Sequence, residues 1–300
     1  MRLVVTGVQG QIATALAESA LTAPNLTVIP LGRPTLDLAT PGDVLALLRQ
    51  IGPDIVISAA AFTAVDRAES EPDLAFRINE EGAGSIATAA AALGLPIIHL
   101  STDYVFSGTK AAPYVETDKT EPLGTYGRSK LAGERLVALA NPDHAILRTS
   151  WIYAANGQNF VRTMLRLASV NSEVSVVADQ YGSPTYAPDI AQAIIEVASH
   201  LLAEPRNDEL RGIFHVCGSG ATSWAGFAKE IFRQSAARGG PSAQVRPISS
   251  EAYPTPAKRP ANSRMDCGKL LRMHRITMPE WEEALSRCMD RLLWEGTLVQ

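Results

Sequence analysis

The sequence predicts an α/β fold in which a doubly wound parallel sheet is followed by a smaller mixed α/β lobe. Apolar strands alternate with helices as far as residue 150, and the strands are nearly unbroken apolar runs, typical of a sheet covered on both faces. Beyond residue 150 the segments are shorter and less regular. We therefore expect one domain over 1–150 and a second lobe mainly over 151–300, with about 173–203 returning to the first.

The first half contains the elements of the sheet. Strands are predicted at 2–6, 26–31, 53–61, 96–101 and 144–150. Helices are predicted from Gly10 onward, and over 41–51, 73–93 and 126–140. Pro41 near a helix start, and Gly94 and Pro96 after a helix end, support two of these boundaries.

The second half shows weaker signals. Helices are predicted at 159–169, 189–203, 223–234 and 279–294, the third capped by Ser223. Short strands are predicted at 173–178, 213–218 and 243–248, whereas 253–264 is too rich in proline for regular structure.

Composition excludes several classes of protein. The 300 residues are 46% hydrophobic and 19% charged, with a net charge of −4, so nucleic acid is not an expected partner. There is no apolar run long enough for a membrane span and no signal-peptide pattern before the first strand. Three widely spaced cysteines suit a reducing compartment, so we expect a cytoplasmic protein, either monomer or homodimer.

A glycine-rich turn joins the first strand to the first helix. Gly7, Gly10 and Ala13 fit the spacing G-x-x-G-x-x-[GA], in which glycine lets backbone N–H groups approach a pyrophosphate. Small residues, including Ala60 and Ala61, end the third strand and leave room for a ribose and phosphate. These features predict a Rossmann-type dinucleotide site.

The second strand ends in Leu31-Gly32-Arg33, without the acid that usually holds an NAD ribose. A guanidinium suits a 2′-phosphate, which favours NADPH and leaves NADH possible. A solvated loop charge would explain Arg33 equally well. Asp37 could meet an adenine amino group or serve as a charge before the second helix.

Three residues form a candidate catalytic set. Tyr126 and Lys130 share one face of a helix, and Thr102 ends the fourth strand. In carbonyl reduction the tyrosine would supply a proton, the threonine would orient the carbonyl, and the ammonium would lower the tyrosine pKa and bond the nicotinamide ribose. Tyr126 and Lys130 are therefore also predicted to bind the cofactor. A Tyr-x-x-x-Lys spacing alone is common on helix surfaces, and its combination with the glycine turn makes it specific.

Several longer motifs resemble the extended short-chain dehydrogenase/reductase superfamily, and within it the dTDP-4-dehydrorhamnose reductase family. They are GVQGQ (7–11), AAFTAVDRAE (60–69), STDYVF (101–106), YGRSK (126–130), RTSWIY (148–153), DQYGSPT (179–185) and YPTPAKRPANSR (253–264). The resemblance implies NAD(P)H-dependent reduction of the 4-keto group of dTDP-4-dehydro-L-rhamnose to dTDP-L-rhamnose. A sugar nucleotide would be the small-molecule partner.

The resemblance also implies residue roles. Tyr126 is the proton donor, Lys130 its partner and Thr102 the carbonyl clamp. The cofactor lining it implies is Gly10, Gln11, Ile12, Asp37, Leu38, Ala61, Phe62 and Thr63. Thr102, Asp103 and Trp151 face the sugar.

The sequence departs from the family pattern at two points. Ser58 stands where the family usually has asparagine, and we expect a structural role for it. Pro188 stands where an acid of a described magnesium site would be expected, so no metal is predicted. Related dehydratases have Thr-Asp-Glu where this chain has Thr102-Asp103-Tyr104, so the base for elimination is absent.

Other candidates for the substrate site have structural alternatives. Trp151 could pack on a deoxysugar or in the core, and Tyr104 and Val105 could shape the pocket wall or pack inside. Arg259 could pair with a pyrophosphate or be a solvated loop charge. His99 lies within a strand and is predicted to be a core histidine.

Two alternative functions stay open at this point. A related ketoreductase could give the product epimeric at C4, and the motifs do not settle this stereochemistry. A non-catalytic, cofactor-binding regulatory subunit is the other alternative, although such a subunit need not keep Thr102, Tyr126 and Lys130 together.

Overall fold

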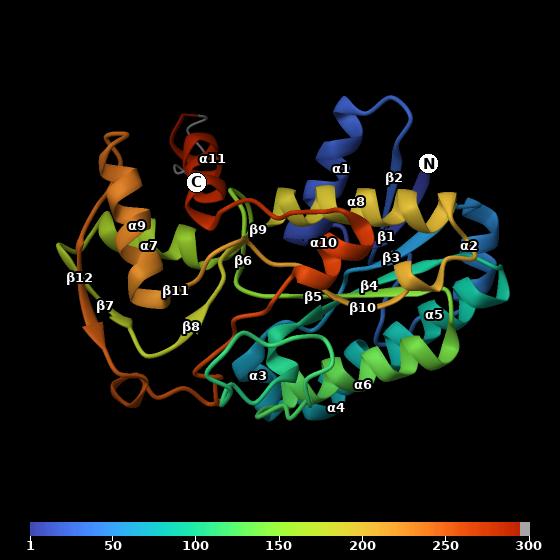
Figure 1. Ribbon diagram of the computed structural model, residues 1–300, viewed down its shortest axis with the longest axis horizontal. Helices are drawn as coiled ribbons and strands as arrows, with labels where there is room; N and C mark the ends of the chain where they lie inside the picture. Colours follow the sequence, from blue (N-terminus) through green and yellow to red (C-terminus); the bar gives the residue numbers. More distant parts are fainter. Residues whose placement is uncertain (295–300) are drawn as a thin grey trace.

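The computed structural model describes residues 1–294 and contains a central six-stranded sheet whose strands are all parallel (Figure 1). The spatial order is β2–β1–β3–β4–β5–β10. The strands are β1 (Arg2–Thr6), β2 (Thr27–Leu31), β3 (Ile55–Ser58), β4 (Ile97–Thr102), β5 (His144–Thr149) and β10 (Gly212–His215). The predicted doubly wound fold is confirmed. From β1 the chain adds β2 on one side and then β3, β4 and β5 on the other, and sheets of this kind bind ligands at that switch point between β1 and β3.

Both faces of the sheet are buried. In β1, Leu3 and Val5 belong to one apolar cluster and Val4 to another, and all three side chains are fully buried. A strand with a core on each side has no solvent face, which explains the unbroken apolar runs.

Helices form the two outer layers. In Figure 1, α1 (Gln11–Thr22) and α8 (Ala187–Ala203) lie above the sheet, and α5 (Ala83–Ala92) and α6 (Thr125–Ala140) lie below it. The first cluster also includes residues of α10 (Gly268–His274), a helix that was not predicted, and the second includes residues of α2 (Val44–Ile51). Asp43 caps α2 by accepting the Ala46 N–H, so this helix begins later than Pro41.

The single helix predicted over 73–93 has three parts. It begins as α4 (Pro72–Phe76), continues through a π-helical turn, η1 (Arg77–Gly82), and ends as α5. A separate helix, α3 (Val65–Ser70), precedes it and was not predicted. Glu71 has φ −127° and ψ 54°, outside the helical region, because a residue before proline is disfavoured there. Pro72 thus separates two helices.

The second lobe has its own apolar core and lies to the left in Figure 1. Its helices are α7 (Phe160–Ala168), α9 (Trp224–Ala236) and α11 (Trp281–Trp294). Three two-stranded sheets accompany them: β7 (Glu173–Val177) with β12 (Gln244–Ile248), β8 (Tyr181–Gly182) with β11 (Thr222–Ser223), and β6 (Ile152–Tyr153) with β9 (Thr185–Tyr186). Ser223 caps α9 as predicted.

The chain returns to the main sheet after entering the second lobe. Within the segment expected to return, α8 packs on α1, but β7 pairs with β12 outside the main sheet. Side chains of β7 alternate between buried and exposed, which suits a strand covered on one face only. Unexpectedly, β10 joins the sheet edge beside β5.

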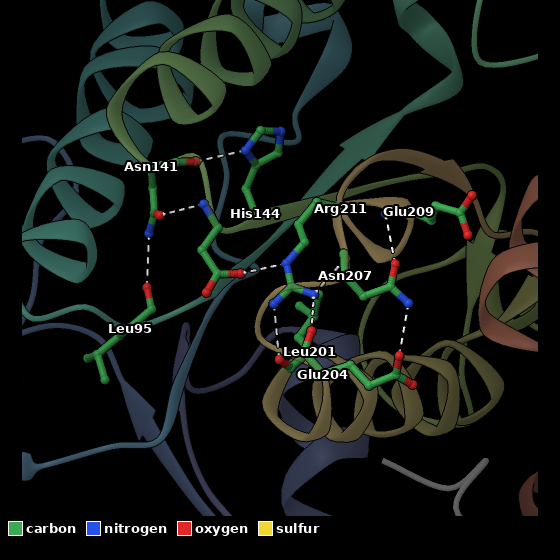
Figure 2. Close-up of polar contacts among 9 residues, drawn as sticks. Leu95, Asn141, His144, Leu201, Glu204, Asn207, Glu209 and Arg211 are labelled. Carbon is green, nitrogen blue, oxygen red and sulfur yellow. Dashed lines mark hydrogen bonds and ion pairs between the residues drawn. The ribbon is translucent and has the colours of Figure 1, made fainter.

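Arg211, just before β10, fastens this returning segment (Figure 2). Its guanidinium donates to Asp143 Oδ1 at 3.0 Å and to the carbonyl oxygens of Leu201, Glu204 and Asn207 at 2.8–3.0 Å. The end of α8 is therefore tied to the start of β5. None of the helices within 1–294 is long and apolar enough to cross a membrane.

Candidate active site

A cavity of about 1000 Å³ lies at the carboxyl ends of β1, β2 and β3. Gly7 begins the turn with φ 99°, a conformation that strains residues with a side chain, and its N–H donates to Leu31 O at 2.6 Å. The Thr6 hydroxyl accepts the Ala59 and Ala60 N–H groups, each at 3.0 Å. These bonds join three strand ends around the cavity.

Nearly all of the predicted cofactor residues line this cavity. They are Gly7, Gly10, Gln11, Ile12, Arg33, Asp37, Leu38, Ala60, Ala61, Phe62 and Thr63. Tyr126 and Lys130 were also predicted to bind the cofactor and are outside this lining. The helix α1 starts at the cavity, and no side chain caps its first N–H groups.

The chemistry of the lining suits the phosphates of a dinucleotide. Backbone N–H groups at the start of a helix attract an anion, and a Cβ at Gly10 would meet nothing within 4 Å, so the approach is open. Arg33 is exposed, and its side chain forms no hydrogen bond or ion pair with any other residue of 1–294. Asp37 accepts the Ala39 N–H at 3.0 Å, which gives it a turn-stabilising role.

Asn79 is a site residue that the sequence analysis missed. It lies in η1, is 1% exposed, and pairs with both backbone groups of Phe62, at 2.8 and 3.2 Å. Its amide also donates to Ser129 Oγ, which donates to Tyr126 O. Asn79 thus connects the cavity wall to the helix that carries Tyr126. A polar residue inside an Ala-rich helical stretch was the signal for it.

Thr102, at the end of β4, and Tyr126, in the first turn of α6, come together at the site. The Thr102 hydroxyl lies close enough to the Tyr126 phenol to lower the Tyr126 pKa, and it donates to Asp103 Oδ1 at 3.0 Å. Asp103 is 2% exposed, and its burial raises the pKa to about 6, partly offset by bonds from the Ser263 and Thr102 hydroxyls. The Thr102 and Ser263 hydroxyls therefore both lie at the Asp103 carboxyl group, which has almost no contact with solvent.

Lys130 lies beneath this pair and is 3% exposed. Its ammonium donates to Leu100 O at 2.7 Å and lies 3.3 Å from His99 Nε2, and His99 Nδ1 lies 3.0 Å from Ser58 Oγ. Burial lowers the pKa of Lys130 to about 8, and the Glu134 carboxylate opposes that shift.

The expected lowering of the Tyr126 pKa by Lys130 is absent. Burial instead raises the Tyr126 pKa above 10, the Thr102 hydrogen bond opposes this, and the Asp103 charge adds to it. The reason is that Lys130 directs its ammonium to Leu100 and His99.

The Pro-rich loop meets the site through Arg259. Its guanidinium donates to Asp66 Oδ2 at 2.9 Å, and its charge opposes the rise in the Tyr104 pKa. Asp66 also accepts the Ala257 N–H, so α3 anchors the loop. Tyr104 packs edge to face on Tyr126 with ring centroids 5.5 Å apart, and burial raises its pKa to about 12.

Trp151 and Val105 lie in two different cores. Trp151 has φ 48° and stacks on Trp224, with ring centroids 3.5 Å apart and planes 8° apart. One face of the indole is therefore already covered. Val105 is fully buried in a cluster with Phe106, so packing is what the structure shows for it. Within 1–294, no group of three or more His, Cys, Asp or Glu residues could hold a metal ion.

Comparison with known proteins agrees with this geometry. The family model of the RmlD substrate binding domain matches residues 1–294. A dTDP-4-dehydrorhamnose reductase of Sinorhizobium fredii is 54% identical, over 99% of this chain and 99% of that protein.

Solved structures are also similar over nearly the whole chain. A dTDP-4-dehydrorhamnose reductase of Clostridium acetobutylicum has a TM-score of 0.89 and 36% identity, over 97% of this chain and 99% of that one. One of Bacillus anthracis, in complex with NADP, has a TM-score of 0.88 and 37% identity, over 96% and 98%. The resemblance drawn from the motifs is confirmed, and the chain belongs to the dTDP-4-dehydrorhamnose reductase family.

Proposed function

We propose that this protein catalyses the NADPH-dependent reduction of the 4-keto group of dTDP-4-dehydro-L-rhamnose, forming dTDP-L-rhamnose. The observation that carries the proposal is the meeting of the Thr102 and Tyr126 hydroxyls near a glycine-lined cavity. The Sinorhizobium fredii relative bears the name of this activity.

The cofactor would occupy the cavity between β1 and β3. The N–H groups of Gly10 and Gln11 would bind its pyrophosphate, and Arg33 its 2′-phosphate. When bound, the nicotinamide supplies the hydride for reduction. Phe62 and Thr63, held through Asn79, would form the wall beside it.

Tyr126 would donate the proton to the carbonyl oxygen. Because its pKa is raised, the phenol is protonated at neutral pH and starts in the form required of a donor. Thr102, which has one hydroxyl proton, would turn it from Asp103 to the same oxygen and afterwards to the phenolate left on Tyr126. Lys130, with a pKa of about 8, is charged near neutral pH and would bind the cofactor ribose.

The substrate would lie between these hydroxyls and the second lobe. Asp103 and Tyr104 would form the wall, with Val105 packed behind them. Trp151 would offer the sugar the part of its indole that Trp224 leaves free. Arg259 would release Asp66 and bind the pyrophosphate of the sugar nucleotide in its place.

The experiment is incubation with NADPH and the 4-keto sugar nucleotide, followed by absorbance and by NMR of the product. We expect loss of NADPH absorbance only with that substrate, and a dTDP-L-rhamnose spectrum. The 6-deoxytalose epimer would establish the opposite stereochemistry at C4, and cofactor binding without turnover would favour a regulatory subunit.

Cofactor preference is tested with Arg33→Ala. Loss of the guanidinium should weaken NADPH about tenfold or more while changing NADH binding little, because only NADPH carries the 2′-phosphate. Arg49→Ala removes the same charge from an exposed position on α2 outside the cavity and is the control. Equal losses for both cofactors would refute the phosphate role.

The cellular setting is part of the same proposal. We infer a cytoplasmic enzyme that acts on a free sugar nucleotide, as monomer or homodimer, without nucleic acid. Three free thiols, Cys217, Cys267 and Cys288, are consistent with a reducing compartment.

A further inference from the structure

Three buried side chains form a hydrogen-bonded row beneath the helix α6. Lys130 Nζ lies 3.3 Å from His99 Nε2, and His99 Nδ1 lies 3.0 Å from Ser58 Oγ. Ser58 and His99 are each 1% exposed, and Lys130 is 3% exposed. The row crosses from β3 through β4 to α6, so it joins the sheet directly to the lysine of the catalytic set.

The direction of each bond follows from the chemistry of the ends. An ammonium has three donors and no acceptor, so His99 Nε2 must accept from Lys130. His99 must then carry its proton on Nδ1 and donate it to Ser58 Oγ. Burial, reinforced by the Lys130 charge, lowers the pKa of His99 well below 6.5, so a neutral ring in a single tautomer is consistent with the row.

The row is an anchor rather than a path for protons. It ends at Ser58, at the end of β3 with its side chain inside the protein, which offers no exchange with solvent. Leu100 O accepts a second ammonium proton at 2.7 Å. Two of the three N–H donors of Lys130 are therefore directed to fixed acceptors, and one is left for another partner.

We propose that His99, held by Ser58, is a positioning residue that fixes the ammonium of Lys130 against β4 and keeps it charged in the working pH range. This inference rests on the proposed function, because it assigns Lys130 to the reducing site. It also replaces the expectation that His99 is an ordinary core histidine and gives Ser58 a partner.

Other ionisable groups near the row come from α6 and β5. The Glu134 carboxylate raises the pKa of Lys130, but Arg148 on β5 pairs with both of its oxygens, at 2.9 and 2.7 Å. His144 acts on His99 in the same direction as Lys130 does. Tyr126 completes the set on α6. With Glu134 paired to Arg148, His99 is the one side chain within residues 1–294 that accepts directly from Lys130.

The first test does not depend on activity. NMR of ¹⁵N-histidine-labelled, NADPH-bound protein should show one neutral histidine with its proton on Nδ1, resistant to protonation down to the lowest pH at which the fold survives. The signal is assigned by its loss in His99→Leu. A proton on Nε2, or a charged ring near neutral pH, would overturn the inference.

The second test compares variants of the row. His99→Leu removes the acceptor, so kcat should fall about tenfold, and the Lys130 pKa should drop by about one unit because the charged form loses a partner. The alkaline limb of kcat should move down with it, while KM for the sugar nucleotide changes less than about twofold. His99→Gln keeps an acceptor oxygen and should recover most of both effects.

Two further variants distinguish a positioning role of His99 from a general loss of folding. Ser58→Ala keeps the ring but removes its anchor, and should give a smaller shift in the same direction even if His99→Leu folds poorly. His274→Leu removes another buried histidine, which contacts His200 away from the site, and should leave the pH profile unchanged. Equal losses in His99→Leu and His99→Gln without a pH shift would overturn the positioning role.

The two proposals fail in different ways. If wild-type protein does not reduce the 4-keto substrate, the proposed function fails. The tautomer of His99 and the Lys130 titration, followed by NMR of ¹³C-lysine-labelled protein, would still decide whether the row anchors the lysine.

Discussion

Burial of individual side chains determines the protonation states in the site. Tyr126 is kept as a phenol, and Lys130 titrates near pH 8. Asp103, with a pKa near 6, is ionised at neutral pH despite being almost fully buried. Burial of a carboxylate without a cationic partner is unfavourable, so ionised Asp103 lowers the free energy of unfolding of the protein.

Tyr126→Phe tests the proton donor. Removing the phenol oxygen should lower kcat by about 100-fold or more, because proton donation in the transition state is lost, while NADPH binding stays within about twofold. Steady-state kinetics and cofactor titration measure both. Tyr253→Phe removes a hydroxyl from a side chain that is 61% exposed and should behave as wild type. A Tyr126→Phe enzyme with the wild-type rate would eliminate the residue as proton donor.

Asp103→Asn tests the cost of the buried carboxylate. The folded-state pKa of about 6 lies above the ordinary 3.8, so the protein favours the protonated form. Its contribution to stability is present below pH 4 and lost as the pH rises through 6. At pH 7 the loss is about 3 kcal/mol, which Asp103→Asn should recover in part.

Urea unfolding at pH 4, 5, 6 and 7 measures this effect. The stability difference between Asp103→Asn and wild type should grow with pH over that range. Asp208→Asn, at the exposed start of the 3-10 helix η3 (Asp208–Leu210) after α8, should show no such trend. A difference independent of pH would contradict the argument.

At the scale of elements, the contact between α6 and η1 positions the catalytic helix. A Cβ at Gly133 would lie 2.1 Å from Asn79 O, so the two backbones touch where Asn79 holds Phe62. Asn79 lies within the π-helical turn η1, and its side chain contacts both α6 and the cavity wall.

Gly133→Ala should push these helices apart. Because backbone blocks the new methyl group, we expect a loss of about 1–3 kcal/mol in unfolding free energy and a lower kcat. Gly84→Ala makes the same change in α5, where the atoms nearest to the new methyl group all belong to the Leu136 side chain, which can rotate. Both variants gain helix propensity, so a comparison by urea unfolding isolates the backbone contact. Equal stabilities would show that α6 tolerates the shift.

At the scale of the whole molecule, ion pairs from the helix α11 and from the Pro-rich loop join the two lobes. From α11, Arg287 pairs with Asp189 on α8, and Arg291 pairs with Glu18 on α1, both through two hydrogen bonds. The Pro-rich loop is joined to α3 through Arg259 and Asp66. The returning β10 places part of the later chain inside the first sheet.

These connections predict a single cooperative unfolding transition. NADPH at 100 times its dissociation constant should raise the unfolding free energy of the whole chain by about 2.7 kcal/mol, because it binds only the folded state. Calorimetry with and without the cofactor should therefore show one peak that moves as a unit. Two peaks, of which NADPH moves only one, would mean that the lobes unfold separately.

Local patterns predicted the sheet, the glycine turn and the main helices because each depends on residues close in sequence. The return of β10 depends on Phe214 finding space beside β5, and Asn79 matters only because η1 turns it toward Phe62. The row from Ser58 to Lys130 joins residues 31 and 41 positions apart. Contacts between residues so far apart leave no periodic pattern in the sequence. The sequence alone could therefore identify Lys130 as a candidate but not His99 and Ser58 as the residues that position it.

The stacked pair Trp151 and Trp224 has an optical consequence. Two nearly parallel indoles 3.5 Å apart couple their electronic transitions, which gives the pair a circular dichroism signal that neither ring has alone. Because Trp151 lies at the proposed sugar site, any ligand that tilts its ring weakens the coupling. The molecule thus contains its own spectroscopic reporter, which can follow entry of the sugar nucleotide before any hydride moves.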